Sequence, residues 1–116
     1  MQKIEKWRIQ EMATALGRFA DVLKQGENRE WGNVFSHFQH EAQKIAQKSE
    51  FDLEALKRLI SNIKGCFKGT SSLINIELTQ DYPGSSERLN KELKEERLHL
   101  QHTLADLEHK AKELIN

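Results

Sequence analysis

Apolar residues in the first half of the chain recur at intervals of three and four, the spacing that places side chains on one face of an α-helix. This pattern predicts three amphipathic helices: one over about residues 3–25, one over about 29–48, and a third that is opened by residues 49–52 and closed at Gly65. Their main apolar positions are Ile9, Met12, Leu16, Phe19 and Leu23 in the first, Trp31, Val34, Phe35, Phe38, Ala42 and Ile45 in the second, and Leu53, Leu56, Leu59, Ile60 and Ile63 in the third. Gly26 and Gly65 are placed to end the first and third helices. Residues 49–52 (Ser-Glu-Phe-Asp) have the form of a capping box that opens the third helix.

A fourth and longer helix is predicted from about Glu87 to Leu114, with Ser85 or Ser86 as its N-cap. Leucines seven residues apart give it a heptad seam, at Leu93, Leu100, Leu107 and Leu114. The three other helices each carry an apolar stripe that must be buried from water, so we favour packing of the seam against them within one chain. Self-association of a homodimer through residues 89–114 is the alternative.

The connection between the third and fourth helices is long for a helical protein. Residues 65–86 hold the only cysteine, proline and tyrosine and half of the glycines, whereas helix connections in bundles usually span about 2–8 residues. Residues 71–78 fit a short helix or a short strand, and we favour a helix because a lone strand would have no partner. The prediction is therefore one all-α domain over residues 1–116, an antiparallel bundle of four main helices with a short helical segment in the long loop at about 65–86.

Composition narrows the classes of function. The chain has 18 Lys and Arg residues against 18 Asp and Glu residues, so it lacks the basic excess typical of proteins that bind nucleic acid or anionic lipid through broad electrostatic attraction. No apolar run approaches the roughly 18 residues of a membrane span, and the N-terminus has no apolar signal segment. A single cysteine cannot form an internal disulfide and fits a reducing compartment. We expect a cytoplasmic protein that contacts neither membrane nor nucleic acid directly.

Two histidine pairs are the strongest candidates for a metal site. His37 and His40 are three residues apart, as are His99 and His102. Each pair flanks an apolar stripe, however, so exposed or boundary side chains are the better interpretation. The Glu-x-x-His motif of di-iron bundles occurs once, at Glu96–His99, and those bundles need it on two helices. We therefore expect no metal and no cofactor.

The long connection offers no catalytic group either. Cys66 has no histidine nearby in sequence, and it follows a helix C-terminus, which raises a thiol pKa rather than lowering it. We interpret it as a small buried filler. Gly65 and Gly69, followed by Ser71 and Ser72, lack the spacing of a phosphate-binding loop. The chain is not expected to be an enzyme.

The two tryptophans have different helical phases. Trp31 is in phase with Phe35 and Phe38, which predicts a core position. Trp7 is out of phase with its apolar neighbours, so it is the better candidate for an exposed aromatic side chain. Exposed tryptophans are enriched among the residues that dominate protein–protein binding.

Residues 67–75 (F-K-G-T-S-S-L-I-N) resemble a turn found in small bacterial helical domains, and Gly26 followed by Trp31, with Asn90 near the start of the last helix, is similar to two further features of those domains. The resemblance covers about residues 16–110. Lys68, Ser71 and Asn75 stand where Gly, Gly and Asp are more common. Such domains are encoded beside polymorphic toxins and act as immunity proteins. The resemblance implies a non-catalytic protein that binds a cognate toxin.

A toxin that acts on nucleic acid, such as a nuclease, would present a basic cleft. Acidic side chains near the loop and the start of the last helix would complement it, and a tyrosine beside Pro83 would form a rigid anchor. The candidate partner-binding residues are Glu77, Asp81, Tyr82, Glu87, Glu92, Glu95 and Glu96. The alternative function is an oligomeric helical adaptor that associates through its leucine heptad helix.

Overall fold

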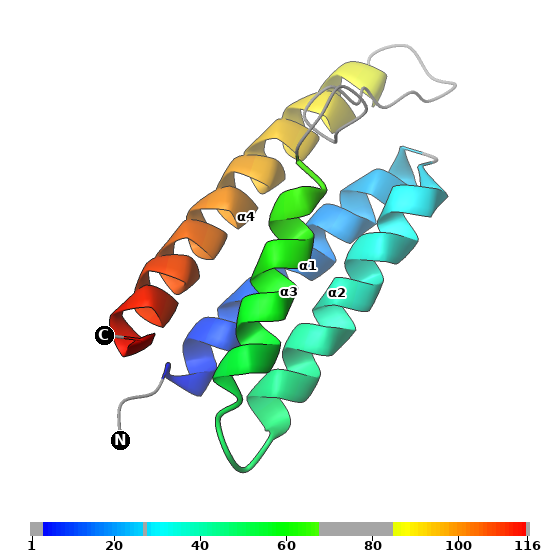
Figure 1. The fold of residues 1–116 in the computed structure, drawn as a ribbon. Coiled ribbons are helices and arrows are strands. Elements are labelled where there is room, and N and C mark those ends of the chain that lie inside the picture. Colours follow the sequence, from blue (N-terminus) through cyan, green and yellow to red (C-terminus); the bar gives the residue numbers. More distant parts are fainter. Residues whose placement is uncertain (1–3, 27, 68–84, 116) are drawn as a thin grey trace.

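The computed structural model describes residues 4–26, 28–67 and 85–115, and these residues form four helices (Figure 1). The helices are α1 (Lys6–Gln25), α2 (Arg29–Gln47), α3 (Leu53–Gly65) and α4 (Ser85–Ile115). They alternate in direction, and α1 and α3 each pack against both α2 and α4. The predicted all-α antiparallel bundle is confirmed, with each helix boundary within three residues of its expected place. The short helical segment predicted at residues 71–78 lies outside the described residues.

Side-chain caps explain where two of the helices begin. Asn28 starts α2, since its Oδ1 accepts a hydrogen bond from the Trp31 backbone N–H at 3.3 Å. Asp52 starts α3, since its Oδ1 accepts from the Ala55 N–H at 3.0 Å. The capping box predicted to begin at Ser49 is therefore wrong. Asp52 is favoured as the cap because Lys48 holds its second oxygen, with Nζ 2.9 Å from Oδ2.

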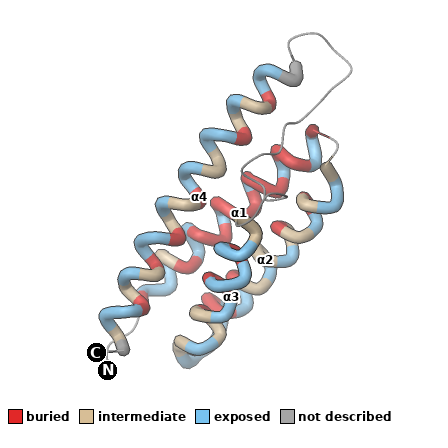
Figure 2. Tube along the Cα trace, turned by 45° about the horizontal axis from the view of Figure 1, so that its top comes forward, coloured by how far each residue is buried: buried red, intermediate tan, exposed pale blue. Residues whose placement is uncertain are grey.

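The contact between α1 and α2 is close because each helix places a glycine in it. A Cβ atom on Gly17 of α1 would lie 2.5 Å from the amide nitrogen of Gln39, and one on Gly32 of α2 would lie 2.6 Å from Cγ of Lys24. Half of the 20 residues of α1 are buried, and Figure 2 shows buried positions along much of this helix. Consequently α1 contributes a large share of the buried side chains of the core.

An aromatic cluster ties three helices together. The rings of Phe19 and Phe35 meet edge to face with centroids 4.9 Å apart, and Phe38 meets Phe35 in the same way at 5.4 Å. Phe67, just past the end of α3, lies 6.1 Å from both Phe19 and Phe35. The end of α3 is thereby anchored on the α1–α2 pair.

The seam of α4 packs inside the bundle, as predicted. Its buried residues are Leu89, Leu93, Leu100, Leu104, Leu107 and Ala111. At 31 residues α4 is longer than α1, which has 20, and its N-terminal end continues past the ends of the other helices (Figure 1). Within the described ranges, no helix has the length and apolar character needed to cross a bilayer.

Candidate binding surface

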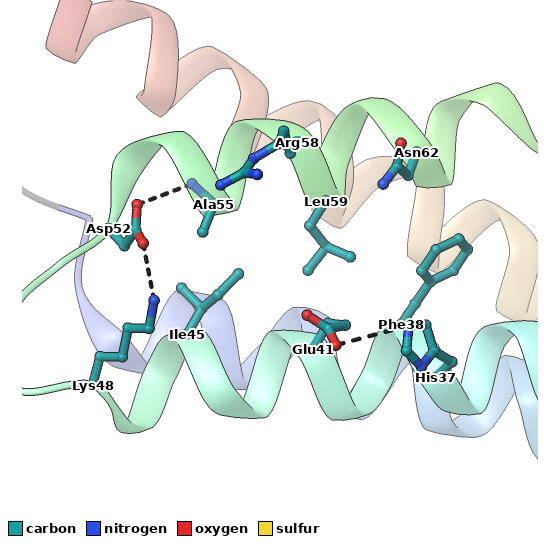
Figure 3. A pocket seen from close by; sticks show the side chains of 10 residues that line it. All are labelled: His37, Phe38, Glu41, Ile45, Lys48, Asp52, Ala55, Arg58, Leu59 and Asn62. Atoms are coloured by element: carbon teal, nitrogen blue, oxygen red, sulfur yellow. Dashed lines mark hydrogen bonds and ion pairs between the residues drawn. The ribbon is translucent and has the colours of Figure 1, made fainter.

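A groove of about 450 Å³ lies between α2 and α3 (Figure 3). Its apolar lining comes from Phe38 and Ile45 on α2 and from Ala55 and Leu59 on α3. Its polar lining comes from His37, Glu41, Lys48, Asp52, Arg58 and Asn62. The groove therefore combines an apolar floor with charges of both signs, an arrangement that can accept side chains of another molecule.

Ion pairs organise the charges of this groove. The hydrogen bond between Lys48 and Asp52 closes the end at the α2–α3 turn (Figure 3). It lowers the pKa of Asp52, and the Ala55 N–H lowers it further. On the α2 wall, His37 Nε2 lies 3.7 Å from Glu41 Oε1, a contact that becomes an ion pair when the imidazole is protonated. The ionisable side chains of the groove therefore lie on both of its helices and at the turn that joins them.

Four of the seven predicted partner-binding residues fall on the N-terminal half of α4. Glu87 and Glu95 are exposed, whereas Glu92 and Glu96 are half-buried. The remaining three candidates, Glu77, Asp81 and Tyr82, lie outside the described residues.

The carboxylates of this half of α4 do not form a broad acidic patch. Residues 87–97 contain four acidic and four basic side chains and so carry no net charge. Negative charge is concentrated only where Glu92, Glu95 and Glu96 lie together within little more than one helical turn. One oxygen of Glu96, Oε2, is buried and has no hydrogen-bond partner among the described residues.

The other candidates from the sequence fall only partly where their patterns indicate, since Cys66 and Trp31 are half-buried rather than buried. The four paired histidines are exposed, and no three metal-ligating side chains gather within the part of the chain that the structure describes. Cys66 is half-buried, its Sγ lies 3.5 Å from the Asn62 carbonyl oxygen, and burial raises the pKa of its thiol. Trp31 is half-buried against Phe35, and Trp7 is 53% exposed.

The groove between α2 and α3 was not among the sequence predictions. Phe38 and Ile45 were assigned only to the buried face of their helix. Their polar neighbours do carry a signal, since Glu41 on α2 and Lys48, which directly follows α2, lie seven residues apart and so fall on the same side of the helix. The spacing of these residues alone could not predict a groove, because the groove also depends on the distance between α2 and α3.

No protein-family model, curated protein or solved structure matches the chain. Its function is therefore argued from its own residues and their geometry.

Proposed function

We propose that this chain is a non-catalytic binding protein that neutralises a cognate bacterial toxin by direct contact in the cytoplasm. One observation carries the proposal: α4 continues past the other helices (Figure 1) and exposes Glu87 and Glu95 on its N-terminal half. A helix packed on a bundle displays its side chains without rearrangement, which keeps the entropic cost of association low. The resemblance of residues 67–75 to a turn of immunity proteins supports the same function.

The charge distribution on α4 suits a basic partner. Glu92 and Glu95 lie close together on the helix, with Glu96 beside them, and they would face the basic cleft of a toxin that acts on nucleic acid. Charges at the rim of an interface mainly raise the rate of association and suppress wrong partners. Tight binding then needs an apolar anchor as well. Tyr82 stays the predicted anchor.

The test uses the toxin domain encoded by the neighbouring gene and two matched charge reversals on α4. Glu87→Lys combined with Glu95→Lys changes two exposed residues on the N-terminal half of α4. We expect this pair to weaken binding at least about tenfold, mostly through the association rate. Asp106→Lys combined with Glu113→Lys reverses two exposed charges near the other end of α4 and should leave the affinity unchanged. Equal effects of the two pairs, measured by surface plasmon resonance, would remove the projecting end as the contact surface.

The alternative proposal is an adaptor that self-associates. In this case α4 would have to contact a second copy of the chain rather than a toxin. The seam leucines are covered within one chain, so a second copy would have to use the outward side of the helix, where Leu98 is 47% exposed. Light scattering over a wide concentration range separates the two functions. A mass that stays monomeric removes the adaptor, whereas a dimer that is lost on Leu98→Glu supports it.

A further inference from the structure

A second groove, of about 270 Å³, lies between α3 and α4 toward the C-terminal end of α4. Lys57 and Lys64 of α3 and Lys112 of α4 line it, together with the hydroxyl-bearing Ser61. Glu108 is the only acidic residue among the lining side chains. Three ammonium groups from two helices therefore surround one carboxylate.

An ion pair fixes how the two helices meet here. Lys64 Nζ lies 2.5 Å from Glu108 Oε2, and α3 and α4 are antiparallel (Figure 1). One turn from this pair, toward the start of α3 and the end of α4, Ser61 comes level with Lys112. Lys57 follows one turn further along α3, so its side chain can reach the same space.

The positive charge of the groove exceeds its negative charge. Glu108 is shared by Lys64 and by Lys112, whose Nζ lies 3.7 Å from Oε1. The hydrogen bond from Lys64 is the largest of the causes that lower the pKa of Glu108. Lys57 forms an ion pair with Glu54, at 3.8 Å, and that carboxylate is 77% exposed, where an ion pair contributes little. Three lysines and one carboxylate line the groove, which leaves two positive charges in a chain whose net charge is zero.

We propose that this groove binds a phosphate group. A second carboxylate would gain little there, because it would only exchange with Glu108, which carries the same charge. A phosphate monoester carries about −1.5 to −2 charges at pH 7, so it can draw Lys112 and Lys57 together without displacing Glu108 from Lys64. Lysine is a common phosphate ligand that acts as a compact point charge. The Ser61 hydroxyl supplies a further donor.

This inference does not rest on toxin binding, because the groove lies at the opposite end of α4 from Glu87 and Glu95. The phosphate could belong to a free metabolite or to a phosphorylated protein. Inorganic pyrophosphate and a short phosphoserine peptide serve as probes for these two sources. An oligoglutamate peptide of similar charge tests the preference for phosphate over carboxylate.

The experiment follows backbone amide resonances by NMR while each probe is added at constant ionic strength. We expect saturable shifts at Ser61 and Lys112 with at least one phosphate probe and weaker binding of oligoglutamate. Lys57→Gln, which breaks only the exposed ion pair with Glu54 among the pairs described above, should weaken phosphate binding up to about fivefold. Lys44→Gln, on α2, should not. Absence of saturation with both phosphate probes, or equal binding of oligoglutamate, would overturn the proposal.

A substitution of Glu108 should have the opposite effect to Lys57→Gln and strengthen phosphate binding. Glu108→Gln removes the negative charge among the lining residues, so it should tighten phosphate binding although it also removes the ion pair with Lys64. Glu113 is the matched control, because it lies on the same helix and pairs with His109 and Lys110 outside the groove. Equal tightening by Glu113→Gln would show a general counterion effect and would contradict a built site. Circular dichroism at the titration temperature verifies that each variant is folded.

Discussion

Lys48, just past the end of α2, donates a hydrogen bond to Asp52, the N-cap of α3, with 2.9 Å between Nζ and Oδ2. The other carboxylate oxygen of Asp52 accepts from the Ala55 N–H at 3.0 Å. One side chain thus starts α3 and ties it to α2. Both contacts favour the ionised carboxylate, the one from Lys48 most, and they lower the pKa of Asp52.

Replacing Asp52 should destabilise the protein in a pH-dependent way. Asp52→Ala removes the cap and the contact with Lys48, so we expect the Tm to fall by roughly 5 °C at pH 7. Because the pKa of Asp52 is lower in the folded state than in the unfolded state, its stabilisation is complete above the ordinary aspartate value of about 3.9. It is lost as the pH falls through the folded-state value. Thermal unfolding between neutral and strongly acidic pH should therefore show the variant and wild type converging in acid.

Ser49→Ala is the control for this prediction, because Ser49 is the other residue that could have capped the helix. We expect its Tm to match the wild type at every pH. If Ser49→Ala lowered the Tm as much as Asp52→Ala does, Ser49 would be the N-cap of α3 after all. If the Tm of Asp52→Ala stayed below that of the wild type in strong acid, the charge of Asp52 would not be the cause of the stabilisation.

The two interhelical glycines should tolerate alanine unequally. At Gly17 the new methyl group would meet the amide end of the Gln39 side chain, which can rotate away. The protein would then gain the higher helix propensity of alanine over glycine without a steric cost. At Gly32 it would meet Lys24 near the stem of the side chain and disturb the hydrogen bond from Lys24 Nζ to Ser36 Oγ, which is 2.7 Å long. We expect Gly32→Ala to be less stable than Gly17→Ala by about 1 kcal/mol in urea unfolding. The reverse order would mean that Gln39 cannot move.

The two tryptophans should differ in their response to ionic quenchers. Trp7 is 53% exposed, and the Arg8 guanidinium lies 4.5 Å from the centroid of its ring. In a Trp31→Phe variant the emission should be red-shifted and quenched more by iodide than by caesium, because Arg8 attracts the anion. In a Trp7→Phe variant both ions should quench weakly, since Trp31 packs against Phe35. Equal iodide quenching in the two variants would contradict this placement.

Periodicity was sufficient to predict the helices because each one must bury a single apolar stripe. Phe35 illustrates this, since its helical phase indicated the core and it is fully buried, whereas its stripe neighbour Trp31 is only half-buried. The start of α3 could not be predicted in the same way. Ser49 and Asp52 are both good caps, and the choice between them depends on Lys48, a contact across the α2–α3 turn.

The surfaces were harder to predict because they combine residues distant in sequence. Lys57 and Lys112 share a groove only because α3 and α4 pack against each other in a register that also brings Lys64 to Glu108. Glu96, by contrast, carried a usable signal. It lies three residues after Leu93 and four before Leu100, which places it beside the heptad seam rather than on the open side of the helix.

This position of Glu96 leads to a prediction about stability. Its Oε2 is buried without a hydrogen-bond partner among the described residues, and such an oxygen costs free energy. Glu96→Leu removes that oxygen and extends the apolar seam, so we expect the free energy of unfolding to rise by about 1 kcal/mol. Urea unfolding measures the change. Glu95→Leu alters the exposed neighbour and should give no such gain.

Glu96→Leu should weaken toxin binding although it raises the free energy of unfolding. Glu96 lies four residues after Glu92 on α4, so its loss weakens the local negative charge offered to a basic partner. A variant that is more stable but binds more weakly would indicate that the carboxylate is retained for recognition at the expense of packing. A variant that is less stable than wild type would show instead that Glu96 supports the bundle, and the unpaired oxygen would then not be a cost.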